Sequence, residues 1–266
     1  MRLRRAGRGA PGVLKADVSR RLVEARPYLR SIELRRDLID RETDFPFSIP
    51  AIQHLNTLEF HPDVTFFVGE NGTGKSTLIE AIARALGFGA EGGTKNVQLA
   101  SAKDSSGLHQ YLKTVKSYKK PKDYYFLRAE SFYNVATYMD DVGYLKGYGD
   151  KSLHQRSHGE AFLATLTQKL RGNGLYILDE PEAALSPQRQ MAALTAIHRL
   201  VQNESQLIIA THSPILLAYP NSQILLFDDS GLSTVRYEDT EHFIVTKNFL
   251  DNRDRMLHHL LADDDA

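Results

Sequence analysis

The stretch that decides the fold is VTFFVGENGTGKSTLIEAIARAL, residues 64–86. It opens with a run of β-branched and aromatic residues, continues through a glycine-rich segment, and ends with Leu78, Ile82 and Leu86 at helical spacing. Glycines adopt backbone angles that other residues disfavour, so several N–H groups can converge on phosphate oxygens at the positive end of the following helix. The stretch therefore predicts a strand, a phosphate-binding loop and a helix.

The side chains of this loop indicate a nucleotide that is bound together with Mg²⁺. From Gly69 to Ser76 the residues match the pattern GxxxxGK[ST]. Lys75 supplies a mobile positive charge for the β and γ phosphates, and Ser76 offers a hydroxyl to the metal. We expect the whole loop to hold the nucleotide: Gly69, Glu70, Asn71, Gly72, Thr73, Gly74, Lys75, Ser76 and Thr77.

Composition limits the class of protein. The chain has 266 residues and 42% apolar content, enough for one large α/β domain with a proper core. Its 33 basic and 33 acidic residues cancel, so any surface for nucleic acid must be local. The absence of cysteine excludes disulfides and thiolate chemistry and is typical of a reducing cytosol. No stretch approaches the roughly 20 apolar residues of a membrane span. We expect a cytoplasmic protein with no direct membrane insertion.

The ends of the chain differ from its middle. Residues 1–27 are rich in arginine, glycine and proline, which predicts a basic, disordered tail or an extended start; a basic arm on an acidic partner is the alternative. Residues 28–255 are expected to form the nucleotide-binding domain, with a helical subdomain inserted at about 96–171. Residues 256–266 are expected to form a polar tail.

A lysine-rich segment with interleaved tyrosines lies inside the expected insertion, and it has two interpretations. The spacing of Lys113, Lys116 and Lys120 is that of one helix side, which favours a solvated helix face with aromatic residues packed beneath. The alternative is a surface that tracks a phosphate backbone and stacks on bases. The residues concerned are Lys113, Lys116, Lys119, Lys120, Lys122, Tyr111, Tyr118, Tyr124 and Tyr125.

Two further apolar strands end in polar residues. The strand at 175–178 is followed by Asp179 and Glu180, and the strand at 207–210 is followed by Thr211 and His212. Ligands of open parallel sheets bind at the carboxyl ends of strands, so these side chains are candidates for the same site. Upstream, Ser157 with a glutamate three residues later predicts a helix start with a capping box.

Taken together, these motifs resemble the ABC-type ATPase superfamily. GENGTGKST (69–77) matches its Walker A loop, YILDEPEAALS (176–186) its Walker B strand and D-loop, and IIATHSP (208–214) its histidine switch. The chain looks most like the soluble, non-transporter branch of chromosome-maintenance and recombination ATPases, and closest to small bacterial predicted ATPases. The resemblance implies an α/β P-loop fold: a mixed sheet with flanking helices, an antiparallel β part and an inserted, mainly helical subdomain.

The resemblance also implies residue roles in a Mg²⁺-dependent hydrolysis of ATP to ADP and phosphate. Asp179 would hold the metal with Ser76, Glu180 would orient and deprotonate the attacking water, and His212 would contact the γ-phosphate. Ser157, Gly159 and Glu160 stand where the family has its signature loop. In this family that loop caps the nucleotide of a second subunit, so ATP would hold together a head-to-tail homodimer that hydrolysis releases.

Two segments depart from the family pattern. In the signature loop, His158 replaces the first glycine and Glu160 replaces the usual glutamine. No glutamine follows the strand expected at 124–127; Glu130 occupies that place as a candidate metal contact, with Gln98 as a second candidate. For the adenine ring, the candidate stacking residues are Phe45 and Phe47, with core packing as the alternative role.

Three functions fit these features. The first is a soluble ATPase acting on nucleic acid or on a protein partner, and the second is the ATP-binding subunit of an ABC transporter. The DEPEAALSP and THSP motifs and the departures at His158 and Glu130 favour the first. A small-molecule kinase is disfavoured by Glu180 next to Asp179. The segment between the Walker motifs is too short for a long coiled-coil arm.

Overall fold

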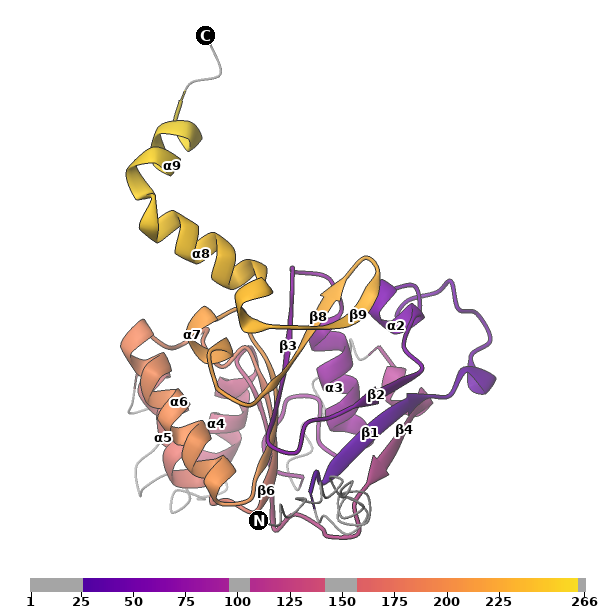
Figure 1. Cartoon of the computed structure of the whole chain (residues 1–266). Coiled ribbons are helices and arrows are strands. Elements are labelled where there is room, and N and C mark those ends of the chain that lie inside the picture. Colours follow the sequence, from indigo (N-terminus) through magenta and orange to yellow (C-terminus); the bar gives the residue numbers. More distant parts are fainter. Residues whose placement is uncertain (1–25, 96–105, 142–156, 263–266) are drawn as a thin grey trace, which may run out of the picture.

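The computed structural model describes residues 26–95, 106–141 and 157–262. At its centre is a six-stranded sheet in the order β5-β6-β7-β3-β8-β9 (Figure 1). Its strands are β3 (Val64–Gly69), β5 (Asp123–Arg128), β6 (Gly174–Asp179), β7 (Gln206–Ala210), β8 (Gln223–Asp228) and β9 (Gly231–Val235). All neighbouring pairs are parallel except β8–β9, which form a hairpin. The strands β3, β6 and β7 are buried along their whole length, as continuous apolar strands of a covered parallel sheet should be.

A smaller antiparallel sheet lies beside the large one. It has the order β2-β1-β4, formed by β1 (Leu29–Leu34), β2 (Thr57–Glu59) and β4 (Leu112–Lys116). This is the antiparallel part that the family resemblance implies, together with the mixed sheet and the flanking helices. The α/β P-loop fold class is therefore confirmed.

Helices and the small sheet cover the two faces of the large sheet (Figure 1). One core joins the sheet to α4 (Phe132–Asp141), α5 (His158–Ala164), α6 (Pro187–Gln202) and α7 (Pro214–Leu217). A π-helical turn, Thr165–Lys169, continues α5. The other core joins the sheet to α2 (Pro50–Gln53), α3 (Lys75–Ala85) and the small sheet. The phosphate-loop helix α3 is thus held between both sheets.

Strand register brings the carboxyl ends of four strands into one row. Arg128 of β5 pairs with Asp179 of β6, Asp179 pairs with Ala210 of β7, and Ala210 pairs with Phe67 of β3. The phosphate loop begins two residues beyond Phe67, at the same edge of the sheet. The three expected sequence motifs therefore meet, because parallel strands all end at one edge.

The described part of the chain ends in two helices that extend away from the body. These are α8 (Glu241–Asp251) and α9 (Arg253–Leu260), drawn in yellow in Figure 1. Neither helix contains a buried residue. Within the described ranges, no helix is both long and apolar enough to cross a membrane. Helix α9 continues past residue 256, where a polar tail was expected.

The structure corrects the interpretation of the lysine-rich segment. Lys113 and Lys116 lie on strand β4, not on a helix, and β4 pairs with β1 over Leu29–Leu34. The helix-like spacing of the lysines is coincidental, since it is the buried Leu112 and pairing with β1 that determine the local structure. Between residues 96 and 171 the described α-helices begin only at Phe132; before them come a short 3-10 helix, Leu108–Tyr111, and the strands β4 and β5, which belong to the two sheets. Most of the expected N-terminal tail, Gln98 and residues 263–266 lie outside the described residues.

Candidate functional site

The phosphate loop depends on glycine at two of its positions. Gly69 has φ +143°, and a Cβ there would lie 2.3 Å from the carbonyl oxygen of Phe227. Gly74 has φ +96°, caps the start of α3, and would place a Cβ 2.7 Å from Cγ2 of Ile49. Neither position has room for a side chain, and both backbones are in a region that favours glycine. The loop can therefore curve closely around a ligand at the N-terminus of α3.

Lys75 is buried beneath this loop. Its Nζ donates hydrogen bonds to the carbonyl oxygens of Gly69 and Glu70, at 2.8 and 2.6 Å. Burial lowers the pKa of Lys75, while the carboxylates of Glu180, Asp179 and Glu182 act in the opposite direction. A cation held by loop carbonyls and faced by three carboxylates is well placed to meet negatively charged phosphate oxygens.

The other predicted loop residues lie around Lys75. Glu70, Asn71 and Gly72 are exposed, and the hydroxyl of Thr73 donates to the carbonyl oxygen of Glu70 at 2.8 Å. Thr77 lies in the first turn of α3. The exposed residues leave the outer surface of the loop open to a ligand.

Ser76 and Asp179 come together from two separate motifs. The hydroxyl of Ser76 donates to Oδ1 of Asp179 at 3.3 Å. Burial raises the pKa of Asp179 to about 6, opposed mainly by the charge of Arg128. A hydroxyl and a carboxylate are oxygen ligands of the kind that Mg²⁺ prefers. In the described ranges no group of three or more His, Cys, Asp or Glu side chains is placed to hold a metal ion.

Arg128 is a site residue that sequence analysis missed. Its guanidinium contacts Glu80 at 2.9 Å, Glu130 at 3.5 Å, and Asp179 at 3.6 Å. The carboxylate of Glu130, the expected metal contact, is paired with this arginine and is 80% exposed. The metal role of Glu130 remains a prediction. The sequence offered one indication of this role: Arg128 is a basic residue at the end of an expected strand, and that strand pairs with the Walker B strand.

Glu180, the expected base, has an unusual backbone. Its φ is +51°, an uncommon region for a residue with a long side chain, and its N–H donates to the carbonyl of Ala210 at 3.0 Å. Its side chain is 41% exposed, and Oε1 lies 3.9 Å from Nε2 of His212. Backbone strain of this kind is concentrated at functional sites. The arrangement presents the Glu180 carboxylate to solvent beside His212.

A second glutamate ties the Walker B segment to the histidine switch. Glu182 accepts hydrogen bonds from the hydroxyl of Thr211 at 2.6 Å and from the backbone N–H of His212 at 2.5 Å. Burial raises the pKa of Glu182, and these two hydrogen bonds oppose that rise. Glu182 was not singled out from the sequence, although it lies within the DEPE run. Through these two hydrogen bonds, Glu182 holds the backbone at Thr211 and His212 in place.

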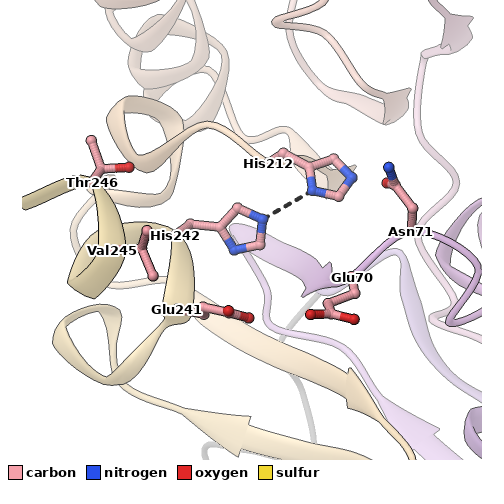
Figure 2. Close-up of a pocket in the computed structure, with 7 residues that line it drawn as sticks. All are labelled: Glu70, Asn71, His212, Glu241, His242, Val245 and Thr246. Carbon is pink, nitrogen blue, oxygen red and sulfur yellow. Dashed lines mark hydrogen bonds between the residues drawn. The ribbon is translucent and has the colours of Figure 1, made fainter. Parts of the chain in front are cut away.

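His212 is also bonded to a residue far along the chain. Its Nδ1 lies 2.9 Å from Nε2 of His242, which belongs to the first turn of α8 (Figure 2). Both histidines line a cavity of about 540 Å³ together with Glu70, Asn71 and Glu241. Burial lowers the pKa of each histidine, which favours neutral rings. Figure 2 places His212 between His242 and the phosphate loop.

The candidate signature loop starts α5 and is held by one arginine. The backbone N–H of Ser157 donates to the carboxylate of Glu160 at 3.0 Å, as expected for a capping box. Arg189 of α6 donates to the hydroxyl of Ser157 at 3.2 Å and to Glu160 at 3.1 Å. A Cβ on Gly159 would lie 2.6 Å from the carbonyl of Ala184. Ser157 is exposed, so its hydroxyl lies on the surface of the subunit rather than in its core.

The two candidate aromatic residues for adenine lie in different environments. Phe47 is only 9% exposed and packs edge to face on Tyr111, with ring centroids 4.9 Å apart, so it is a core residue. Phe45 is 67% exposed. Ile49, four residues later, contacts Gly74 at the start of α3. The segment that carries Phe45 therefore lies against the phosphate loop.

Comparisons with protein families match the parts of the chain that build this site. A model described as "AAA domain" matches residues 47–142, which include the phosphate loop. A second, described as "AAA domain, putative AbiEii toxin, Type IV TA system", matches residues 157–218, which include the signature, Walker B and switch segments. No curated protein matches the chain significantly.

Solved structures with similar folds have low sequence identity. A "putative metal-chelate type ABC transporter" is 18% identical, with 82% of this chain and 87% of that chain covered and a TM-score of 0.46. The SMC head domain from Thermotoga maritima is 15% identical, with 79% and 99% covered and a TM-score of 0.44. CbiO1 from Clostridium perfringens, part of the ABC transporter complex cbiONQ, is 19% identical, with 78% and 90% covered and a TM-score of 0.44.

The two AAA-domain models thus cover the segments that build the site. These segments contribute the phosphate loop, the hydrogen-bonded Ser76 and Asp179, and the switch histidine, which meet at one edge of the sheet. The chain is therefore similar to AAA-domain ATPases over these two segments, residues 47–142 and 157–218.

Proposed function

We propose that this chain binds ATP with Mg²⁺ and hydrolyses it to ADP and phosphate. The observation that carries the proposal is the contact between Ser76 and Asp179, which joins the phosphate loop to the Walker B strand. Lys75 is buried beside the same carboxylates, and Glu180 directly follows Asp179. These groups have the chemistry that phosphoryl transfer requires, namely positioning and charge neutralisation.

Each residue has a separate part in the proposed reaction. The backbone N–H groups of residues 72–75 bind phosphate oxygens, and Lys75 exchanges its loop carbonyls for the β and γ phosphates. Mg²⁺, held by Ser76 and Asp179, would neutralise charge on the phosphates. Glu180 accepts a proton from the attacking water, and His212 donates a hydrogen bond to the γ-phosphate. The leaving group is ADP, which needs no proton from the protein to depart.

We further propose that two subunits share each nucleotide in a head-to-tail homodimer. The support is the exposed hydroxyl of Ser157, which Arg189 and the capping box hold in a fixed position on the surface. In such a dimer Ser157 and Gly159 of one copy would cap the triphosphate bound by the other. Binding of ATP would then join the copies and hydrolysis would release them.

Mixing two inactive variants tests this sharing. Ser157→Asp keeps a good helix-capping side chain and a partner for Arg189 but places negative charge against the triphosphate of the other copy. Lys75→Ala loses the nucleotide of its own subunit. If the site is shared, each variant is inactive alone. In an equal mixture about half of the dimers are heterodimers with one intact site each, so the activity returns to about a quarter of the wild-type value.

The matched control is Ser233→Asp, which adds the same charge at an exposed serine of strand β9. We expect this variant to hydrolyse ATP at the wild-type rate. Full activity of Ser157→Asp alone, or no recovery in the mixture when size-exclusion chromatography shows that heterodimers form, would contradict a shared site.

For the partner, we propose nucleic acid bound at a lysine-lined pocket. Lys95, Lys116, Lys119 and Lys120 surround a cavity of about 160 Å³ together with Tyr28 and Tyr124. Nζ of Lys95 lies 3.7 Å from the ring centre of Tyr124. The pKa of Lys95 is lowered, mainly by burial and secondly by the positive charge of Lys116. Lys119 also pairs with Glu204 at 2.8 Å. Gathered cations beside aromatic rings suit a phosphate backbone with stacked bases.

The test measures the ATPase rate with and without single- and double-stranded DNA. We expect DNA to stimulate the wild type and not the triple variant Lys116→Glu, Lys119→Glu, Lys120→Glu. The control, Lys247→Glu, Arg253→Glu, Arg255→Glu, changes net charge equally on α8 and α9 and should keep the stimulation. An unstimulated wild type, or equal loss in both triple variants, would contradict the proposed partner.

A further inference from the structure

His242 is hydrogen-bonded to the switch histidine, His212, although it lies outside the sequence motifs described above. It lies in the first turn of α8, 30 residues beyond His212, and its Nε2 is 2.9 Å from Nδ1 of His212. The two rings have centroids 5.1 Å apart and are tilted by 48°. Figure 2 shows this bond as the dashed line between the switch and the helix. The distance is that of a true hydrogen bond, so one of the two nitrogens must carry the proton.

The two arrangements of that proton have different consequences for His212. If His212 donates from Nδ1, its Nε2 has no proton and presents a lone pair to the carboxylate of Glu180, 3.9 Å away. If His242 donates from Nε2, the proton of His212 is on its own Nε2. That N–H then faces the carboxylate of Glu180, and the interaction is attractive. In the first arrangement, by contrast, a lone pair faces the carboxylate and the interaction is repulsive.

The surroundings of Nε2 favour the second arrangement. Within the described part of the chain, Nε2 of His212 is buried and makes no hydrogen bond. A donor at that atom meets the negative charge of Glu180, and it can also donate to a phosphate oxygen. An acceptor there could do neither. The local field therefore selects the tautomer in which His212 carries its proton on Nε2.

Burial, aided by the positive charge of Lys75, lowers the pKa of both rings and favours neutral histidines, for which this choice of tautomer exists. Burial and then Lys75 lower the pKa of His212, and Glu180 acts against them. Burial, His212 and Lys75 lower the pKa of His242, and Glu241 and Glu182 act against them. The pair thus has one proton between the rings and one on the outer nitrogen of His212.

We propose that His242 is a positioning residue for ATP hydrolysis: its Nε2–H donates to Nδ1 of His212 and thereby fixes the Nε2–H of His212 toward Glu180 and the γ-phosphate. The inference rests on the proposed ATPase function. It also means that the first turn of α8 is hydrogen-bonded directly to the switch histidine.

Two amide variants separate this role from a merely structural one. In His242→Gln the side-chain NH₂ occupies about the place of the imidazole Nε2 and can still donate to His212. In His242→Asn the NH₂ lies nearer the place of Nδ1 and cannot reach. We expect kcat in the glutamine variant to stay within about threefold of wild type and kcat in the asparagine variant to fall about tenfold or more, with KM for ATP nearly unchanged in both. Equal values of kcat in the two variants would overturn the proposal.

A measurement without ATP decides the tautomer itself. Nitrogen-15 NMR of the full-length protein, with His212 assigned by substitution, should show its proton on Nε2. In His242→Glu the new carboxylate can only accept, so the proton should move to Nδ1. A wild-type proton on Nδ1, or no change of tautomer in His242→Glu, would overturn the inference. Because this measurement needs no hydrolysis, it stays decisive even if the ATPase function is wrong.

Discussion

The hydroxyl of Ser76 and the carboxylate of Asp179 are joined by a 3.3 Å hydrogen bond across 103 residues of sequence. Ser76 lies in the first turn of α3 and Asp179 at the end of β6. Strand β7 lies between β3 and β6, so the contact depends on strand order and on register rather than on chain proximity. It is the point at which the phosphate loop and the Walker B motif become one site.

Asp179→Asn should stabilise the nucleotide-free protein above neutral pH. In the wild type the folded state binds a proton up to about pH 6, whereas an unfolded aspartate releases it near pH 4. Stability from this group is therefore present at low pH and falls as pH rises through that window. The asparagine variant avoids the loss, which is up to about 3 kcal/mol, and this figure already includes the opposing attraction between Asp179 and Arg128.

Urea unfolding of wild type and Asp179→Asn at about pH 5 and about pH 8 checks this sign. We expect the stabilisation by asparagine to be larger at the higher pH, while Mg²⁺-dependent ATP hydrolysis is lost. A variant that is less stable than wild type at the higher pH would show that the charged Asp179 is well compensated by Arg128.

Arg128→Leu should destabilise the fold, because it leaves Asp179 and Glu80 without their shared cation. Breaking a buried ion pair on one side costs about 3 kcal/mol or more. The loss should be larger at about pH 8 than at about pH 5, since carboxylates that are protonated no longer need the arginine. Urea unfolding at both pH values measures it, and an equal loss at both would contradict the electrostatic role.

Glu130 offers a test of the metal contact that the sequence suggested. Glu130→Gln restores the residue type usual in the family and should keep ATP hydrolysis, whereas Glu130→Ala should raise the Mg²⁺ concentration required for half-maximal rate. Because the Glu130 side chain is 80% exposed, neither change should alter stability by more than about 1 kcal/mol. An alanine variant with an unchanged Mg²⁺ requirement would exclude the metal role.

Phe45→Ala should weaken nucleotide binding without affecting the fold. Stacking of a base on an aromatic ring contributes about 1–3 kcal/mol, so we expect Kd for ATP to rise about tenfold. The matched control is Phe47→Ala, which removes a core ring packed on Tyr111 and should cost about 3–5 kcal/mol of stability. Calorimetric titration with ATP and thermal melts distinguish the two effects. An unchanged Kd in Phe45→Ala would assign adenine to another residue.

Local sequence patterns were sufficient for the parts of the fold that depend on local physics. The buried strands β3, β6 and β7 are continuous apolar runs, and the loop after β3 is set by its glycines. The capping box at Ser157 is likewise a local device. Because strands of a parallel sheet end at one edge, even the meeting of Lys75, Asp179 and His212 could be predicted.

The rest of the site depends on contacts between distant segments. Arg128 contacts the carboxylate of Asp179 on the neighbouring strand. Arg189 donates a hydrogen bond to Ser157, 32 residues earlier, and His242 is hydrogen-bonded to the ring of His212, 30 residues earlier. Nothing in the sequence near His242 marks it, since a histidine at a helix start is common. The strand at Lys113 was missed for a related reason: pairing with β1 outweighed a spacing that suits a helix.

The most direct test of the account measures ATP binding and ATP hydrolysis on the same preparations of wild type, Glu180→Gln and Lys75→Ala. We expect the wild type to hydrolyse ATP, and Glu180→Gln to bind ATP with similar affinity but to turn over at least about a hundredfold more slowly. Lys75→Ala should lose binding itself. Hydrolysis by Glu180→Gln at the wild-type rate, or wild-type protein that binds no nucleotide in the presence of Mg²⁺, would contradict the proposed roles of these two residues at one shared site.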